Sequence, residues 1–73
     1  MITHSEMEKV VNFVGENSGI YSLLDLTRII PGSISGLNPA ETRRIVNSAE
    51  NQRKVYRGRN KNYYLRIKGE RRQ

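Results

Sequence analysis

The chain has 73 residues, of which 36% are apolar, and it contains no cysteine. This length allows one small domain, near the lower limit at which a single apolar core sustains a fold. The composition excludes a disulfide framework and a thiolate zinc site, and no apolar run approaches the roughly 18 residues that span a bilayer. Because the N-terminus also lacks the basic and apolar regions of a signal peptide, we expect a soluble, cytoplasmic protein with no membrane partner.

Charge is distributed unevenly along the chain. The net charge is +6, from 13 Lys or Arg residues and 7 Asp or Glu residues. Residues 1–42 hold two cations against five carboxylates, a net charge of −3, whereas residues 43–73 hold eleven cations against two carboxylates, a net charge of +9. Positive charge concentrated in this way predicts a polyanionic partner.

A first helix is predicted to begin near the N-terminus. Two overlapping capping-box patterns can mark its start: Thr3-x-x-Glu6 and Ser5-x-x-Glu8. The apolar residues that follow have the spacing of one buried helical stripe: Met7, Val10, Val11 and Val14. The sequence Asn17-Ser18-Gly19 is predicted to end the helix, because glycine readily takes the left-handed conformation found beyond helix C-termini.

A second helix is predicted to begin after Ser22, which forms an N-cap pattern with Asp25. Just before it, Ile20 and Tyr21 have the residue types of a very short strand. The apolar face of the helix comprises Leu23, Leu26 and Ile30, with Leu24 and Ile29 on its flank. Pro31-Gly32 is predicted to stop the helix, because a residue that precedes proline disfavours the helical conformation.

The clearest helix start follows a linker in which Ile34 and Leu37 are predicted apolar anchors. Asn38 is a favourable N-cap, Pro39 fits the first helical position, and Glu41 completes a capping-box-like arrangement. Successive helical residues lie about 100° apart, which divides this third helix into two faces. The core face holds Thr42, Ile45, Val46 and Ala49, and the opposite face holds Arg43, Arg44, Asn47 and Asn51, with Ser48 and Lys54 at its edges.

Two alternating segments, residues 54–57 and 63–68, predict a β-hairpin. Between them, Gly58 and two asparagines supply turn residues, flanked by Arg59 and Lys61. The side chains predicted to face the core are Val55, Tyr63, Leu65 and Ile67, and those predicted to face outward are Tyr64, Arg66 and Lys68. The two-residue period lets aromatic residues and cations share one segment.

Three helices followed by a basic hairpin resemble the winged helix-turn-helix DNA-binding proteins. The resemblance lies in residues 22–68, about two thirds of the chain, and above all in the stretch TRRIVNSAENQRKVYRGRNKNYYLRI. This stretch looks like a recognition helix, a first strand, a charged loop and a return strand. The predicted fold class is therefore α+β, a three-helix winged helix-turn-helix with a C-terminal β-hairpin wing over residues 1–68, followed by a basic, flexible tail over residues 69–73. The resemblance also implies a small transcriptional regulator, of a kind common in viruses and plasmids, including those of archaea.

The resemblance implies that the third helix lies in the major groove of double-stranded DNA. The residues that would reach base edges or phosphates are Arg43, Arg44, Asn47, Ser48 and Asn51, with Lys54 beyond them. Arg can pair with guanine, and Asn with adenine, through two hydrogen bonds. The residues that would contact the DNA backbone or the neighbouring minor groove are Arg57, Arg59, Asn60 and Lys61. Ser22 could donate to a phosphate at the start of the second helix.

The linker between the second and third helices departs from the family pattern. It is expected to run from Pro31 to Leu37, which is longer than the three- or four-residue turn usual in helix-turn-helix motifs. The angle between the two helices is therefore left open by the sequence.

Two other interpretations stay open. In an RNA-binding, ribosome-associated module, outward Tyr56 and Tyr64 could stack on unpaired bases, although such tyrosines also stabilise hairpins as cross-strand pairs. In a protein-interaction adaptor, the basic face would dock on an acidic partner. The mixture of Arg and Asn on the third helix favours base reading, since docking by charge alone does not call for Asn. A basic helix face can also be simply solvated.

Catalysis is not expected. The chain has a single histidine, His4, at a predicted helix start, and no clustered carboxylates, so it offers neither an acid–base pair nor a metal-ligand set. It also lacks a glycine-rich phosphate loop. We therefore expect no enzyme activity, cofactor or metal. The oligomeric state is left open as monomer or homodimer, with Phe13 either on a dimer face or in the core.

Overall fold

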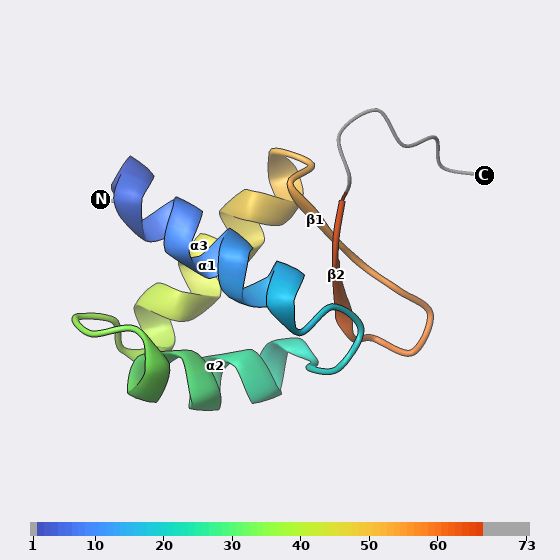
Figure 1. Ribbon diagram of the computed structural model, residues 1–73, viewed down its shortest axis with the longest axis horizontal. Coiled ribbons are helices and arrows are strands. Elements are labelled where there is room, and N and C mark those ends of the chain that lie inside the picture. The colour runs from blue at the N-terminus through green and yellow to red at the C-terminus, as the bar shows by residue number, and fades with distance from the viewer. Residues whose placement is uncertain (1, 67–73) are drawn as a thin grey trace.

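The computed structural model describes residues 2–66. Three helices are followed by a two-stranded antiparallel hairpin: α1 (His4–Glu16), α2 (Leu23–Ser33), α3 (Pro39–Asn51), β1 (Val55–Arg57) and β2 (Tyr63–Leu65). In Figure 1, α1 crosses α3, α2 packs along one side of the pair, and the hairpin stands beside the end of α1 and the start of α2. This α+β winged-helix arrangement confirms the predicted fold class. The predicted tail over residues 69–73, and the orientations predicted for Ile67 and Lys68, lie outside the described residues.

All three helices begin with a capping box. In each, the N-cap side chain accepts from the main-chain N–H three residues on, and the carboxylate of that residue accepts from the N-cap N–H. The pairs are Thr3 with Glu6, Ser22 with Asp25, and Asn38 with Glu41. Of the two patterns at the first helix start, the structure uses Thr3, and Ser5 lies inside the helix. These side chains satisfy main-chain donors that would otherwise lack a partner.

The prediction that Pro31-Gly32 stops α2 is wrong, because the helix continues to Ser33 with Pro31 inside it. Proline removes one main-chain donor, but so close to the helix end the loss affects a single bond. The main-chain N–H of Ile34 donates to the carbonyl of Ile30 at 2.7 Å and closes the last turn. The linker to α3 is therefore residues 34–38, which lies nearer the length of a helix-turn-helix turn than expected.

The apolar core lies where the three helices meet and the hairpin closes one side. Its buried residues are Met7, Val10, Val14, Leu26, Ile30, Leu37, Ile45, Val46, Ala49, Val55 and Tyr63. Leu37 is thus an anchor of the linker, as predicted, and Ile34 packs against the core from the same linker. Phe13 is partly buried, and its ring stacks on Tyr21 with centroids 6.1 Å apart. Phe13 therefore belongs to the margin of the core.

The hairpin, residues 55–65, is referred to below as the wing. Its strands pair Val55 with Leu65, Tyr56 with Tyr64 and Arg57 with Tyr63, and they are shorter than the predicted segments. Within the loop, the N–H of Lys61 donates to the carbonyl of Gly58, and the N–H of Gly58 donates to the carbonyl of Asn62, both at 2.9 Å. Lys61 takes a left-handed φ of 69°. This is the three-residue hairpin loop in which a type I turn is followed by a left-handed residue.

Ile20 and Tyr21, predicted as a very short strand, do not form one, and the next residue, Ser22, makes an isolated bridge with Asn62. The N–H of Tyr63 donates to the carbonyl of Tyr21, and the N–H of Gly19 donates to the carbonyl of Tyr63, both at 2.8 Å. The turn between α1 and α2 is thereby tied to β2 by main-chain hydrogen bonds. These bonds fix the wing relative to the start of α2.

Candidate nucleic-acid interface

α3 has one buried face and one polar, exposed face. Thr42, Ile45, Val46 and Ala49 are buried, as the helical spacing predicts. The outer face of α3, meaning Arg43, Arg44, Asn47 and Asn51, is exposed. Helical geometry separates the two sets by about half a turn, so the structure confirms the division of this helix into a core face and a cationic, amide-bearing face.

An open hollow borders the outer face of α3 on the side of α2. It is lined by Thr27 of α2 and by Pro39, Ala40, Arg43 and Arg44 of α3. The two guanidinium-bearing residues therefore edge a concave surface formed by the helix-turn-helix pair. A rod-shaped polyanion can approach such a surface more closely than it can approach a convex one.

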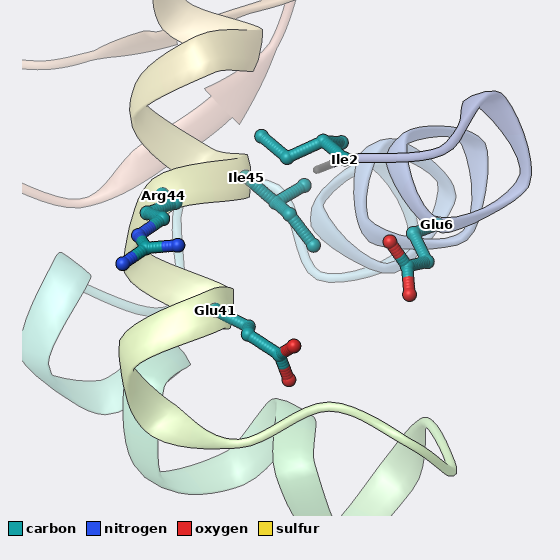
Figure 2. A pocket seen from close by; sticks show the side chains of 5 residues that line it. All are labelled: Ile2, Glu6, Glu41, Arg44 and Ile45. Atoms are coloured by element: carbon teal, nitrogen blue, oxygen red, sulfur yellow. The ribbon is translucent and has the colours of Figure 1, made fainter.

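The opposite flank of α3 near its start is acidic, as Figure 2 shows. A small hollow there is lined by Ile2 and Glu6 from the α1 end and by Glu41, Arg44 and Ile45 from α3. Arg44 also lines this hollow, and in Figure 2 its guanidinium points away from α1. Negative charge repels a polyanion, so Glu6 and Glu41 mark the limit of the cationic surface on this side.

The wing is attached to α3 by a side-chain hydrogen bond. The hydroxyl of Tyr63 donates to Oε1 of Glu50 at 3.1 Å. Burial of Tyr63, then the charge of Glu50 and this hydrogen bond, raise the pKa of the phenol, and the charge of nearby Arg57 opposes them. The burial of Tyr63 confirms its predicted place in the core. Arg57 lies directly opposite Tyr63 on the neighbouring strand, which explains its effect on this phenol.

Glu50 is a residue of the candidate interface that the sequence-based prediction left out. It is the only carboxylate between residues 42 and 69, in a segment otherwise rich in cations. A lone carboxylate in a basic segment predicts a partner for that carboxylate, which here is the Tyr63 hydroxyl of the wing. That pattern was the signal that could have identified it.

The wing loop exposes two cations and uses its asparagine internally. Arg59 and Lys61 are exposed. The side chain of Asn60 accepts from the N–H of Asn62 through Oδ1 and donates to the hydroxyl of Tyr64 through Nδ2, both at 3.1 Å. Asn60 was predicted as a DNA contact, but both ends of its amide hold the loop in shape.

Two of the predicted contact residues, Ser48 and Lys54, lie toward α1. Both line a hollow with residues from the N-terminal end of α1, including Thr3 and His4. The Oγ of Ser48 also accepts a hydrogen bond from Nε2 of Gln52 at 3.0 Å. The structure therefore does not group Ser48 and Lys54 with the hollow that Arg43 and Arg44 line beside α2.

Ser22 lies at the start of α2, beside the wing. Its hydroxyl accepts from the N–H of Asp25 at 3.3 Å, and its own N–H donates to the Asp25 carboxylate at 3.4 Å. The carboxylate already occupies the positive end of the helix dipole and would repel a phosphate there. The predicted contact between Ser22 and a phosphate therefore has a local competitor.

Tyr56 and Tyr64 form a cross-strand pair on the outward side of the wing. Their rings stack with centroids 5.3 Å apart and planes inclined by 10°. The ring of Tyr64 also lies so close to the main chain of two glycines that a Cβ at Gly19 or Gly58 would come within 2.7 Å and 2.6 Å of it, respectively. The close contacts around Tyr64 support the interpretation that it stabilises the hairpin rather than stacking on bases.

In residues 2–66, no group of three His, Asp or Glu side chains converges in a way that could hold a metal ion. None of the helices within this range is long and apolar enough to cross a membrane. Comparisons of the chain with protein-family models, curated proteins and solved structures give no significant match. A function for the chain must therefore be proposed from its residues and their geometry alone.

Proposed function

We propose that the protein binds double-stranded DNA and acts as a sequence-specific transcriptional regulator. In this proposal the outer face of α3 enters the major groove and the wing contacts the neighbouring backbone or minor groove. The function implies a location inside the cell that holds the DNA. The observation that carries the proposal is the exposed row of Arg and Asn on α3, bordered by a cationic wing that is hydrogen-bonded to the same helix.

The outer face of α3 has the chemistry needed for reading bases. The major groove is about 12 Å wide and admits an α-helix, and Arg and Asn match the donor and acceptor patterns of guanine and adenine. Asn47 and Asn51 lie four residues apart, so they share this face. Asn is a weak helix former, and two of them on an exposed face favour a recognition role over simple solvation.

The wing supplies charge rather than base recognition. Arg57, Arg59 and Lys61 are exposed cations within or beside its loop. Phosphate contacts of this kind set the orientation of a protein on the duplex and make binding depend on salt. If three to five phosphates are neutralised by the wing and α3 together, the logarithm of the affinity should fall with the logarithm of salt with a slope of about −3 to −4.5.

The proposal is tested by fluorescence anisotropy with a labelled random duplex, single-stranded DNA and an RNA hairpin, each over 50 to 200 mM salt. A selection from a randomised duplex library run in parallel reports sequence preference and the spacing of half-sites, which distinguishes monomer from homodimer binding. We expect the duplex to bind best, with a steep salt slope and an enriched motif. Tighter binding of the RNA hairpin, or binding of all three probes with no salt dependence, would contradict the proposal.

A further inference from the structure

Two residues other than glycine have left-handed backbone conformations within residues 2–66, and both are cations. Arg53 has a φ of 62° and Lys61 a φ of 69°. In this region the Cβ of an L-residue crowds the neighbouring carbonyl, so glycine is the favoured residue. Backbone strain that persists at particular positions often marks a functional requirement.

Arg53 is the C′ residue of a Schellman motif, directly after the C-cap of α3. Gln52 is the C-cap of the helix. The N–H of Arg53 donates to the carbonyl of Glu50 at 3.0 Å, and the N–H of Lys54 donates to the carbonyl of Ala49 at 2.9 Å. The position between C-cap and Lys54 is the one at which glycine is most common. Both bonds are main-chain bonds, so the side chain of Arg53 does nothing to close the turn.

The side chain of Arg53 is exposed and belongs to a group of cations at one end of the wing. Lys54 follows it directly, and the N–H of Arg66 donates to the carbonyl of Lys54 at 3.1 Å. The other end of the wing carries Arg59 and Lys61. Each end of the wing therefore holds one cation at a backbone position that favours glycine.

We propose that Arg53 is a further phosphate-contacting residue of the DNA-binding surface, kept at a strained position for its charge. This inference rests on the proposed function and extends the surface past the last turn of α3. Arg53 would contact a phosphate at the edge of the groove that α3 occupies. A guanidinium suits this task because it can donate two parallel hydrogen bonds to phosphate oxygens.

The test compares Arg53→Gly, Arg53→Lys and the control Lys9→Gln, which removes one exposed cation from α1. Affinity for a random duplex is measured across the salt series, and stability by urea unfolding. We expect Arg53→Gly to unfold at a higher urea concentration and to bind duplex roughly 3- to 10-fold more weakly near 0.1 M salt, with a salt slope smaller by about one. Arg53→Lys should retain most of the affinity and slope, and Lys9→Gln should change neither.

Two outcomes would overturn the inference in distinguishable ways. If wild type binds duplex and Arg53→Gly binds with the same affinity and slope, then the contact at Arg53 is wrong and the proposed function stands. If wild type itself fails to bind duplex at 50 mM salt, the proposed function is wrong and the contact falls with it.

Discussion

Left-handed backbone positions are filled differently in the two halves of the molecule. In residues 2–42 the positions with positive φ hold Gly19 and Gly36, whereas in residues 43–66 they hold Arg53 and Lys61. Glycine takes this conformation without the steric cost that a Cβ imposes. The first half thus uses the residue that the backbone favours. In our proposal, the second half gives up stability to place a positive charge there. The contrast follows the charge of the chain, and the variants below test whether the two cations serve the fold or a partner.

Among the variants that test this contrast, Gly19→Ala is expected to change the free energy of unfolding most. Gly19 has a φ of 83°, and a Cβ there would lie 2.7 Å from Cε2 of Tyr64. The substitution combines left-handed strain with overpacking against a ring that is itself stacked on Tyr56. We expect the free energy of unfolding to fall by about 2–4 kcal/mol, measured by urea unfolding followed by circular dichroism.

Gly36→Ala is the matched control. Gly36 has a φ of 91°, but a Cβ there would meet no atom within 4 Å. Only the left-handed strain remains, and the expected loss is about 1 kcal/mol. Equal losses in the two variants would show that the contact between Gly19 and Tyr64 contributes nothing to the wing.

The second effect concerns base reading by α3. Asn47→Ala and Arg44→Ala are each expected to weaken binding to the selected DNA site by about 1–3 kcal/mol and to relax the preference for the base that each residue reads. Both side chains are exposed, so the fold should be little affected. The measurement is anisotropy with the selected site and with random duplex.

Asn12→Ala provides the comparison for Asn47→Ala, because Asn12 is an exposed asparagine on α1. It should leave both affinities unchanged. If Asn47→Ala weakens the selected site and the random duplex by the same factor, Asn47 does not read bases and the outer face of α3 acts through charge alone.

Local patterns were sufficient to predict most of the fold. The capping boxes at Ser22 and Asn38, the buried stripe of α3 and the burial of Val55 and Tyr63 all follow from residue types a few positions apart. Such short-range rules apply wherever the chain later packs. The prediction that Pro31 ends α2 was wrong because it considered only the main-chain donor that proline lacks. It left out the hydrogen bond from the N–H of Ile34 to the carbonyl of Ile30, which closes the last turn of the helix.

The features that sequence could not predict depend on contacts between distant segments. Gly58 lies in the wing turn, as predicted, but Lys61 takes the left-handed conformation, and Gly58 also gives room to the ring of Tyr64. Ser48 and Lys54 lie toward α1 because of the way α1 crosses α3. The spacing of nearby residues predicts neither the strand register nor the way the helices cross.

The third effect is a pH dependence that comes from the attachment of the wing to α3. The pKa of Tyr63 is raised by burial and by Glu50, so the folded state holds the phenol proton more tightly than the unfolded state does. The resulting stability is complete below the ordinary tyrosine pKa of about 10 and is lost as pH rises through the raised value. Tyr63→Phe also removes the hydrogen bond to Glu50, and should lower stability at pH 7 by about 1 kcal/mol.

Other groups that titrate at alkaline pH are present in both wild type and Tyr63→Phe. The difference in free energy of unfolding between the two proteins therefore reports the Tyr63 phenol alone. Urea unfolding at pH 8, 9, 10 and 11 should show the difference shrinking above pH 10, as wild type loses the contribution that the variant never had. A difference that stays constant over this range would show that ionisation of Tyr63 is not linked to unfolding.

The smallest effect is expected at the wing loop and tests the opening contrast directly. Lys61→Gly removes one cation and relieves a left-handed φ of 69°, so stability should rise by up to about 1 kcal/mol. Binding to all duplexes should weaken by a few fold, and the salt slope should decrease by about one. Arg59→Gly removes the same charge from an exposed position of the same loop that lacks a positive φ. It should weaken binding equally but without any gain in stability. A loss of affinity in Lys61→Gly accompanied by a loss of stability would mean that lysine suits this turn, and that no stability is given up there for charge.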